Sequence, residues 1–176
     1  MAHIGLTTDE LLSLTWSAPP RLRYAARLDG LNILARETVA LVGDGSPLLL
    51  GRLAELLEGC AVLDGSAAAA AGTLRIHAQQ AARVGVKALA ISEPFQPSLP
   101  GPARSLALAD LAGLSQLGVT TVVEVGDVML ASLLADRVVV VRGGRPLVAY
   151  PVIAARPRSA DDVGPVAARV ASRLAT

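Results

Sequence analysis

A short glycine-bearing turn between a predicted strand and a predicted helix carries the residues most suggestive of chemistry. The strand covers residues 38–42, the helix covers residues 48–58, and the turn begins with Gly43, Asp44, Gly45 and Ser46. A phosphate-binding loop has the same strand–loop–helix order, and its backbone N–H groups, a lysine and a hydroxyl group hold phosphates and magnesium. This turn is shorter, lacks the lysine, and contains Asp44, which would repel an anion. The sequence therefore predicts a nucleotide-binding scaffold without the chemistry that grips the phosphates.

Two other predicted strands end in residues that could contribute to the same site. Ser92 and Glu93 stand at the end of the strand predicted at residues 88–92, and Gly126 and Asp127 follow the strand predicted at residues 120–125. Ligands of open α/β sheets bind in the crevice at the carboxyl ends of the strands. We therefore expect these residues to line that crevice, with Glu93 as the one candidate for a catalytic base.

Each of these residues also has a structural interpretation that the sequence alone leaves open. Glu93 could simply end a strand before a proline, Asp127 could cap a helix, and residues 43–46 could form a tight turn before the next helix. A helix N-terminus can nonetheless bind phosphate or sulfate, so anion binding at Ser46 is a further alternative.

The sequence offers little material for metal binding or nucleophilic catalysis. It contains two histidines and one cysteine, so neither a Ser/His/Asp set nor a metal-binding spacing can be assembled. Cys60 has no partner for an internal disulfide, and its simplest role is that of a small core residue. We therefore predict no metal and no bound cofactor.

The elements that position these residues alternate between strand and helix along 176 residues, which is the length of one domain. Apolar residues make up 52% and aromatic residues 2%, so Leu, Val, Ile and Ala must build the core. We predict strands at residues 21–26, 31–34, 38–42, 61–63, 88–92, 120–125, 137–141 and 147–153. We predict helices starting near residue 8 and at residues 48–58, 74–83, 105–117, 127–134 and 163–174. This alternation favours an α/β fold with a mostly parallel sheet and helices on both faces.

Three segments depart from the strand–helix alternation. Residues 66–72 are nearly all alanine and could form a helix or a flexible connector. Residues 94–104 contain four prolines, which predict an extended loop. Residues 156–158, Arg-Pro-Arg, are interpreted as a solvated linker.

Charge and hydropathy narrow the class of protein. The formal net charge is +1 and the basic residues are scattered, so we expect no nucleic-acid partner. The N-terminus has no signal-peptide pattern, and no apolar stretch is long enough to cross a bilayer. We expect a cytoplasmic protein without a direct membrane span.

Taken in order, the motifs resemble the ATP-binding subunit of an ABC transporter in a reduced form. The matching segments are residues 28–33 and 37–43 (approach to Walker A), 88–95 (Walker B), 120–127 (switch-histidine strand), 134–141 (the next strand) and 150–158 (the ending of the nitrate, sulfonate and taurine importer branch). The resemblance implies a three-layer P-loop-NTPase-like fold. It also matches Tyr24 to the aromatic residue that stacks on adenine in that family.

Departures from the family pattern decide what the resemblance implies for function. Ser92 replaces the Walker B aspartate, Gly126 replaces the switch histidine, and the interval from Gly43 to Ser92 is too short for the helical signature subdomain. Glu93 does match the position of the catalytic base. Because phosphoryl transfer depends on positioned positive charge and metal, a base alone has nothing to act on. We therefore predict a non-catalytic protein without an ATP or magnesium cofactor.

The resemblance divides the chain into an N-terminal helical extension at residues 1–20, a reduced α/β core at residues 21–158 and a C-terminal helix at residues 159–176 packed on that core. It implies an interaction or regulatory subunit that forms a homodimer, or a heterodimer with an ABC ATPase relative, in a transporter complex that brings it to the membrane. The alternative is a small-molecule, nucleotide or anion-binding protein, or a weak NTPase, that uses the crevice at the strand ends.

Overall fold

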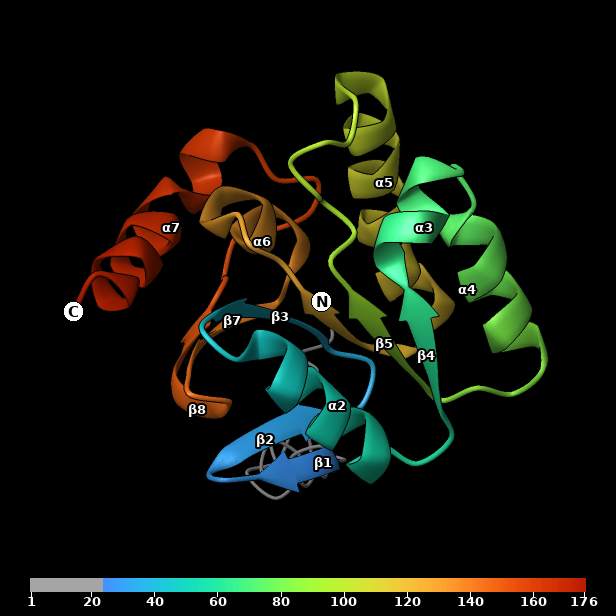
Figure 1. The fold of residues 1–176 in the computed structure, drawn as a ribbon, viewed down its shortest axis with the longest axis horizontal. Coiled ribbons are helices and arrows are strands. Elements are labelled where there is room, and N and C mark those ends of the chain that lie inside the picture. Colours follow the sequence, from blue (N-terminus) through green and yellow to red (C-terminus); the bar gives the residue numbers. More distant parts are fainter. Residues whose placement is uncertain (1–23) are drawn as a thin grey trace, which may run out of the picture.

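The computed structural model describes residues 24–176, the side chain of Ser115 excepted, and shows a layered α/β arrangement (Figure 1). A six-stranded sheet has the order β4-β5-β6-β3-β7-β8, and β1 and β2 form a separate antiparallel pair. Strands β3, β4, β5, β6 and β7 are all parallel to one another, and β8 runs antiparallel to β7. The predicted mostly parallel sheet is confirmed. The helix predicted near residue 8 lies outside the described residues.

Strands and helices alternate along the chain, as the apolar pattern predicts. The strands are β1 (Tyr24–Leu28), β2 (Leu31–Leu34), β3 (Thr38–Gly43), β4 (Cys60–Asp64), β5 (Ala88–Ser92), β6 (Thr120–Glu124), β7 (Arg137–Arg142) and β8 (Arg145–Pro151). The helices are α2 (Ser46–Leu56), α3 (Gly65–Ala70), α4 (Leu74–Arg83), α5 (Gly101–Leu114), α6 (Val128–Leu134) and α7 (Ala160–Leu174), with a 3-10 turn at Ser115–Leu117. Each parallel strand from β3 to β7 is joined to the next through at least one helix, as crossover connections require.

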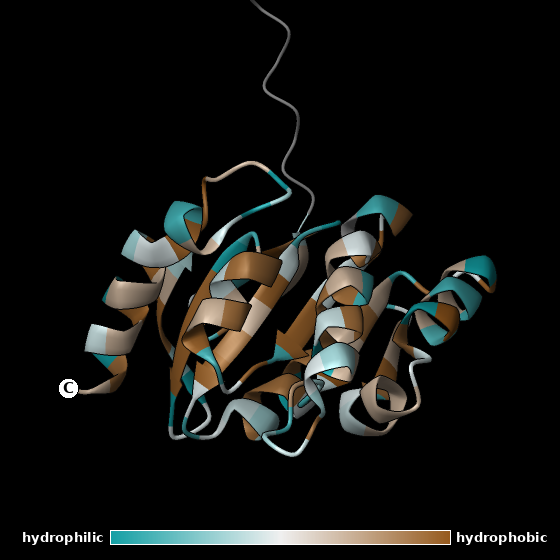
Figure 2. Cartoon of the chain, turned by 90° about the horizontal axis from the view of Figure 1, so that it is seen from above, coloured by the Kyte–Doolittle hydropathy of each residue, from teal (hydrophilic) through white to brown (hydrophobic). Residues whose placement is uncertain are grey.

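Both faces of the sheet bury apolar side chains, and β3 shows this most clearly. Val39 and Leu41 pack into a cluster under α2 and the β1-β2 hairpin, while Ala40 and Val42 pack into a second cluster under α3 to α7. Figure 2 looks onto the second side, where the brown strands lie beneath helices that combine brown with teal and pale residues. Helices on both faces are therefore confirmed.

The proline-rich segment is shorter and more structured than expected. Turns occupy most of residues 94–99, and α5 already begins at Gly101 rather than at Ser105. Pro102 is compatible with this early start because the first helical turn has no intrahelical use for its N–H groups. The prediction of an extended loop over residues 94–104 is therefore wrong at its C-terminal end.

Side-chain caps fix the N-termini of α3 and α7, which the apolar pattern alone does not define. The Asp64 carboxylate accepts a hydrogen bond from Ala67 N at 3.1 Å, and the alanine run accordingly forms α3. Ser159 and Asp162 form a capping box, which starts α7 at Ala160 instead of the expected Val163.

The segment at residues 156–158 is not a solvated linker. The Arg158 side chain is 4% exposed, and its guanidinium donates to the carbonyl oxygens of Ser132, Ala135, Val152 and Ala154. These carbonyls include the C-terminal end of α6, where a cation is favourable. Arg158 therefore ties the loop before α7 to the core.

None of the helices within residues 24–176 combines the length and the apolar character that crossing a bilayer would require.

Candidate functional site

The carboxyl ends of β3, β5 and β6 lie side by side at one edge of the sheet, and most predicted site residues follow them. A cavity of about 590 Å³ opens at this edge. Its polar lining residues are Glu93, Gln96, Arg104 and Asp127, and Gly126 lies among them. Three predicted residues, Glu93, Gly126 and Asp127, therefore share one cavity.

The loop between β3 and α2, where a phosphate would be held, is packed against other protein atoms. The Ser46 hydroxyl donates a hydrogen bond to Gly43 O at 2.8 Å, and Ser46 is 2% exposed. Gly45 is the N-cap of α2, with φ 77°. A Cβ atom added at Gly45 would lie 2.3 Å from Gly144 N, in the turn between β7 and β8. This turn therefore closes over the loop.

Gly43 has an equally crowded environment. Its φ is 113°, and an added Cβ would lie 2.4 Å from Val141 O and 2.9 Å from the Leu174 side chain. Close approach of β7 and α7 thus accounts for glycine at this position. The two glycines that suggest a phosphate loop are explained by packing within the chain.

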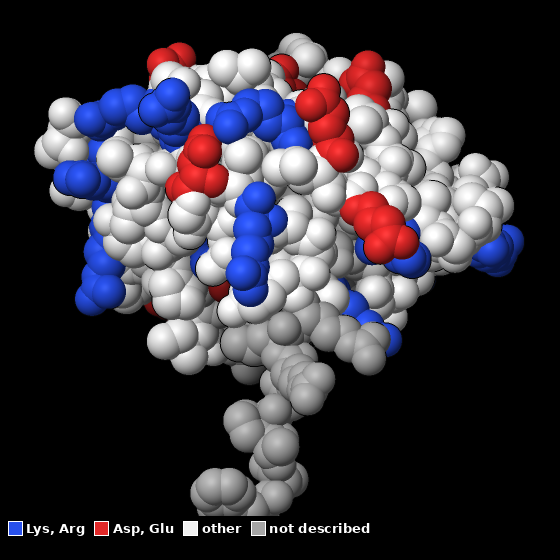
Figure 3. Space-filling view, turned by 90° about the horizontal axis from the view of Figure 1, so that it is seen from below, with Lys and Arg blue, Asp and Glu red and all other residues white. Residues whose placement is uncertain are grey.

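Charges around the loop do not fit a triphosphate. Asp44 is an exposed anion, and the first cationic residue after the loop is Arg52, inside α2. Arg52 forms an ion pair with Asp29 at 3.0 Å and contacts Gly144 O at 3.4 Å. Figure 3 shows the face that carries α2 and the β1-β2 hairpin, on which basic and acidic side chains are interspersed. The residues present therefore lack the cationic grip that phosphate groups need.

Ser92 and Glu93 occupy a tight junction at the end of β5. A Cβ added at Gly65, the first residue of α3, would lie 2.2 Å from Ser92 O. Glu93 is exposed and adopts φ 34°, an uncommon conformation for a residue other than glycine. The α3 start thus packs directly on Ser92, and the Glu93 carboxylate is left facing solvent and the cavity.

Glu124 was not predicted as a site residue, although it ends β6 at the same edge. It is 7% exposed and has no hydrogen-bond or ion-pair partner within residues 24–176. Burial raises the pKa of its carboxyl group above the usual value of 4.5, and the neighbouring charge of Glu93 raises it further. A single charge inside the run Thr120-Thr121-Val122-Val123-Glu124-Val125 is the sequence signal that could have revealed it.

Asp127 has a structural role in addition to its place in the cavity. Its Oδ1 atom accepts hydrogen bonds from Met129 N at 2.8 Å and Leu130 N at 3.0 Å, so it is the N-cap of α6. Asp127 thus caps a helix and lines the cavity at the same time.

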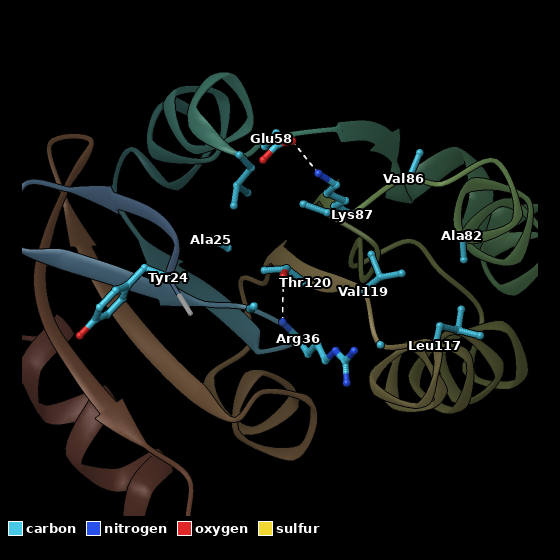
Figure 4. Close-up of a pocket in the computed structure, with 14 residues that line it drawn as sticks. Tyr24, Ala25, Arg36, Glu58, Ala82, Val86, Lys87, Leu117, Val119 and Thr120 are labelled. Carbon is cyan, nitrogen blue, oxygen red and sulfur yellow. Dashed lines mark hydrogen bonds and ion pairs between the residues drawn. The ribbon is translucent and has the colours of Figure 1, made fainter. Parts of the chain in front are cut away.

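Tyr24 lies away from the other predicted residues, at the amino ends of β5 and β6. Figure 4 shows it at the side of a cavity of about 470 Å³ whose polar lining includes Arg36, Lys87 and Thr120. The Arg27 guanidinium lies 4.0 Å from the centre of the Tyr24 ring. Tyr24 is therefore not brought together with Gly43 or Ser46.

The described residues contain no group of three or more His, Cys, Asp or Glu side chains that could hold a metal ion. Cys60 is half-buried, and burial raises the pKa of its thiol, which keeps it in the less nucleophilic form.

Comparison with known proteins gives structural matches only. No protein-family model and no curated protein matches the sequence. The ATP-binding cassette MJ0796, solved as a dimer in a post-hydrolysis state with ADP and phosphate, is similar with a TM-score of 0.50 and 12% identity over 75% of this chain and 92% of that one. The protein cbiO1 from Clostridium perfringens, part of the ABC transporter complex cbiONQ, gives a TM-score of 0.49 and 15% identity over 86% of this chain and 89% of that one. At such identity the likeness concerns the fold, and this chain has the α/β fold of an ATP-binding cassette.

Proposed function

We propose that this protein is a non-catalytic relative of the ABC ATPases that acts as an interaction or regulatory subunit. The observation that carries the proposal is the closed loop between β3 and α2, where Gly45 packs against Gly144 and the Ser46 hydroxyl is bonded to Gly43 O at 2.8 Å. The β7–β8 turn occupies the Cβ side of Gly45 and the Ser46 hydroxyl is already bonded, so the loop offers few free groups for a phosphate.

The remaining chemistry at the carboxyl edge supports the same conclusion. Glu93, Glu124 and Asp127 are acidic, and Arg104 is the cation of the cavity, with its Nη2 atom already directed to the carbonyl oxygens of Gln96 and Pro97 at 3.5 and 3.4 Å. A triphosphate at this edge would therefore be repelled by the acidic side chains. Glu93 would then be a base without a substrate to act on.

The proposed partner is a second ATPase-like subunit, either another copy or a competent relative. MJ0796, which shares the fold, was solved as a dimer. We further propose that the assembly belongs to an importer of the nitrate, sulfonate and taurine type, because the ending at residues 150–158 resembles that branch. The chain would then act in the cytoplasm, held at the membrane by its partner.

Turnover and assembly are tested separately. A sensitive phosphate-release assay with Mg-ATP should give the same background rate for the wild type and Glu93→Gln. Light scattering after size-exclusion chromatography should show a dimer, alone or after addition of an importer ATPase from the same genome. A strict monomer that joins no such subunit would contradict the assembly, and Glu93-dependent phosphate release would contradict the loss of catalysis.

The cavity at the carboxyl edge favours a second candidate function, the binding of a small polar molecule. Glu93, Asp127 and Arg104 all line this cavity and together could hold a ligand that carries both an ammonium group and an anionic group. Thermal denaturation with amino acids, phosphate and nucleotides would reveal such a ligand as a rise in melting temperature.

A further inference from the structure

The outward face of α5 forms the floor of a groove on the helical side of the sheet. Residues spaced by three and four positions share this face, and the groove they form encloses about 720 Å³. They are Ser105, Leu108, Ala109, Ala112 and Gly113 on α5, with Gln116 in the 3-10 turn that follows it. Five of the six are small or apolar, so the floor offers weakly hydrated surface rather than the charged surface usual on an exposed helix.

The centre of this floor has unfilled space. A Cβ atom added at Gly113 would meet nothing within 4 Å. Gly113 has helical backbone geometry, so neither a turn nor a close contact within residues 24–176 requires glycine there. Small side chains on a helix allow another helix to approach its backbone closely.

Arginine side chains lie on both sides of the floor. Figure 1 shows α5 between α4 and α6, and Arg75 comes from α4 while Leu133 comes from α6. Arg156 and Arg158, from the loop before α7, complete the second side. The groove therefore has an apolar floor and two cationic rims.

The charge of the rims is only partly balanced within the protein. Asp136 pairs with Arg156 at 2.8 Å and lies 3.6 Å from Arg158. Arg75 is exposed and has no hydrogen-bond or ion-pair partner within residues 24–176. Three arginines against one aspartate give a formal excess of two positive charges, of which Arg75 is exposed, whereas Arg156 is paired with Asp136 and the Arg158 side chain is 4% exposed.

We propose that this groove is the docking site for an acidic amphipathic helix of a partner protein. The apolar stripe of such a helix would cover Leu108, Ala109 and Leu133, and carboxylates on its flanks would pair with Arg75 and Arg156. Arg158 is held by backbone carbonyls, so it positions the second rim rather than binding directly. The inference rests on the proposed role as an interaction subunit and names the surface and the chemistry of one contact.

A synthetic helix provides a direct test on the full chain. The probe is a fluorescent peptide of about 18 residues, long enough to be helical, with leucines spaced by three and four positions and glutamates on both flanks. A matched peptide carries lysine in place of each glutamate. We expect the acidic peptide to bind at least about tenfold more tightly than the basic one, and to bind more weakly at high salt, because opposite charges steer and stabilise the complex.

Variants assign the binding to the groove. Gly113→Leu should fill the floor and Arg75→Glu should reverse one rim, and each should weaken the acidic peptide by at least about fivefold. The matched controls are Gly51→Leu on α2, where an added Cβ also meets nothing within 4 Å, and Arg83→Glu at the other end of α4. Both controls should bind the peptide like the wild type.

Three outcomes would overturn the proposal. The first is equal binding of the two peptides, and the second is equal loss in the groove variants and the controls. The third is binding of decanoate or of a second copy of the chain at the groove while the acidic peptide fails to bind. None of these outcomes bears on phosphate release, so the proposed loss of catalysis is judged independently.

Discussion

Gly45 and Gly113 are both glycines near a helix, yet their surroundings are opposite. At Gly45 an added Cβ would lie 2.3 Å from backbone nitrogen, and the adjacent charge belongs to Asp44. At Gly113 an added Cβ meets nothing, and the adjacent charges belong to arginines. The loop that suggests ligand binding is filled by the protein itself, whereas a helix face without any motif is open. Open space and uncompensated charge, rather than the glycine pattern, therefore indicate the surface that we propose for binding.

Gly45→Ala should produce the largest loss of stability. The substitution combines a left-handed φ of 77° with a clash against the backbone of Gly144, which cannot move without shifting the β7–β8 turn. We expect the free energy of unfolding to fall by at least about 3 kcal/mol in urea denaturation. Gly51→Ala, on the exposed face of α2, should instead gain about 0.5 to 1 kcal/mol. A Gly45→Ala protein as stable as the wild type would mean that the loop is open.

Arg158→Ala should cost about 2 to 3 kcal/mol of unfolding free energy, because several buried carbonyl groups lose a charged donor. Arg156→Ala should cost only about 1 kcal/mol, since its ion pair with Asp136 is partly exposed. Thermal and chemical denaturation of the two variants measures this difference. Equal losses would indicate that Arg158 has no special role in holding the loop before α7.

Glu124→Gln should change how stability depends on pH. Burial and the charge of Glu93 raise the pKa of the Glu124 carboxyl group in the folded protein, so the folded state holds this proton more tightly than the unfolded chain. The contribution of Glu124 is thus full below its usual pKa of 4.5 and is lost as the pH rises through the folded pKa. The glutamine variant should therefore melt at a higher temperature than the wild type at pH 8 and at nearly the same temperature at pH 4. A difference in melting temperature that is independent of pH would argue against a buried Glu124 carboxyl group with a raised pKa.

Gly113→Ala should give the smallest effect, a gain of about 0.5 to 1 kcal/mol, because alanine restricts the unfolded chain and its methyl group enters open space. Urea denaturation measures the gain. A loss of unfolding free energy instead would show that other atoms already fill the space beside Gly113.

Much of the fold could be predicted because its signals are local. The run Val39 to Val42 is apolar without interruption, which is typical of a parallel strand covered on both faces. Asp64 and Asp127 cap helices that follow them directly, so short-range spacing is informative there. The proline pattern predicts a loop and so places the start of α5 too late, whereas Pro102 fits a first helical turn.

The packing around Gly45 and the contacts of Arg158 with the end of α6 could not be predicted because the partners are distant in sequence. Gly45 meets Gly144, and Arg158 reaches Ser132 and Val152, contacts that depend on how β7, β8 and α6 pack. The charge of the α5 groove could not be predicted for the same reason, because Arg75 and Arg156 are far apart in the sequence and line one groove only in the folded chain. A sequence pattern shows which residues are present, but not which backbone fills the space beside them.

Calorimetric titration of the full chain with Mg-ATP tests the central claim most directly. The closed loop between β3 and α2 predicts no saturable heat at nucleotide concentrations up to about 1 mM, which corresponds to less than about 4 kcal/mol of binding free energy. Saturable binding below that concentration, weakened by Ser46→Ala and dependent on magnesium, would contradict the account.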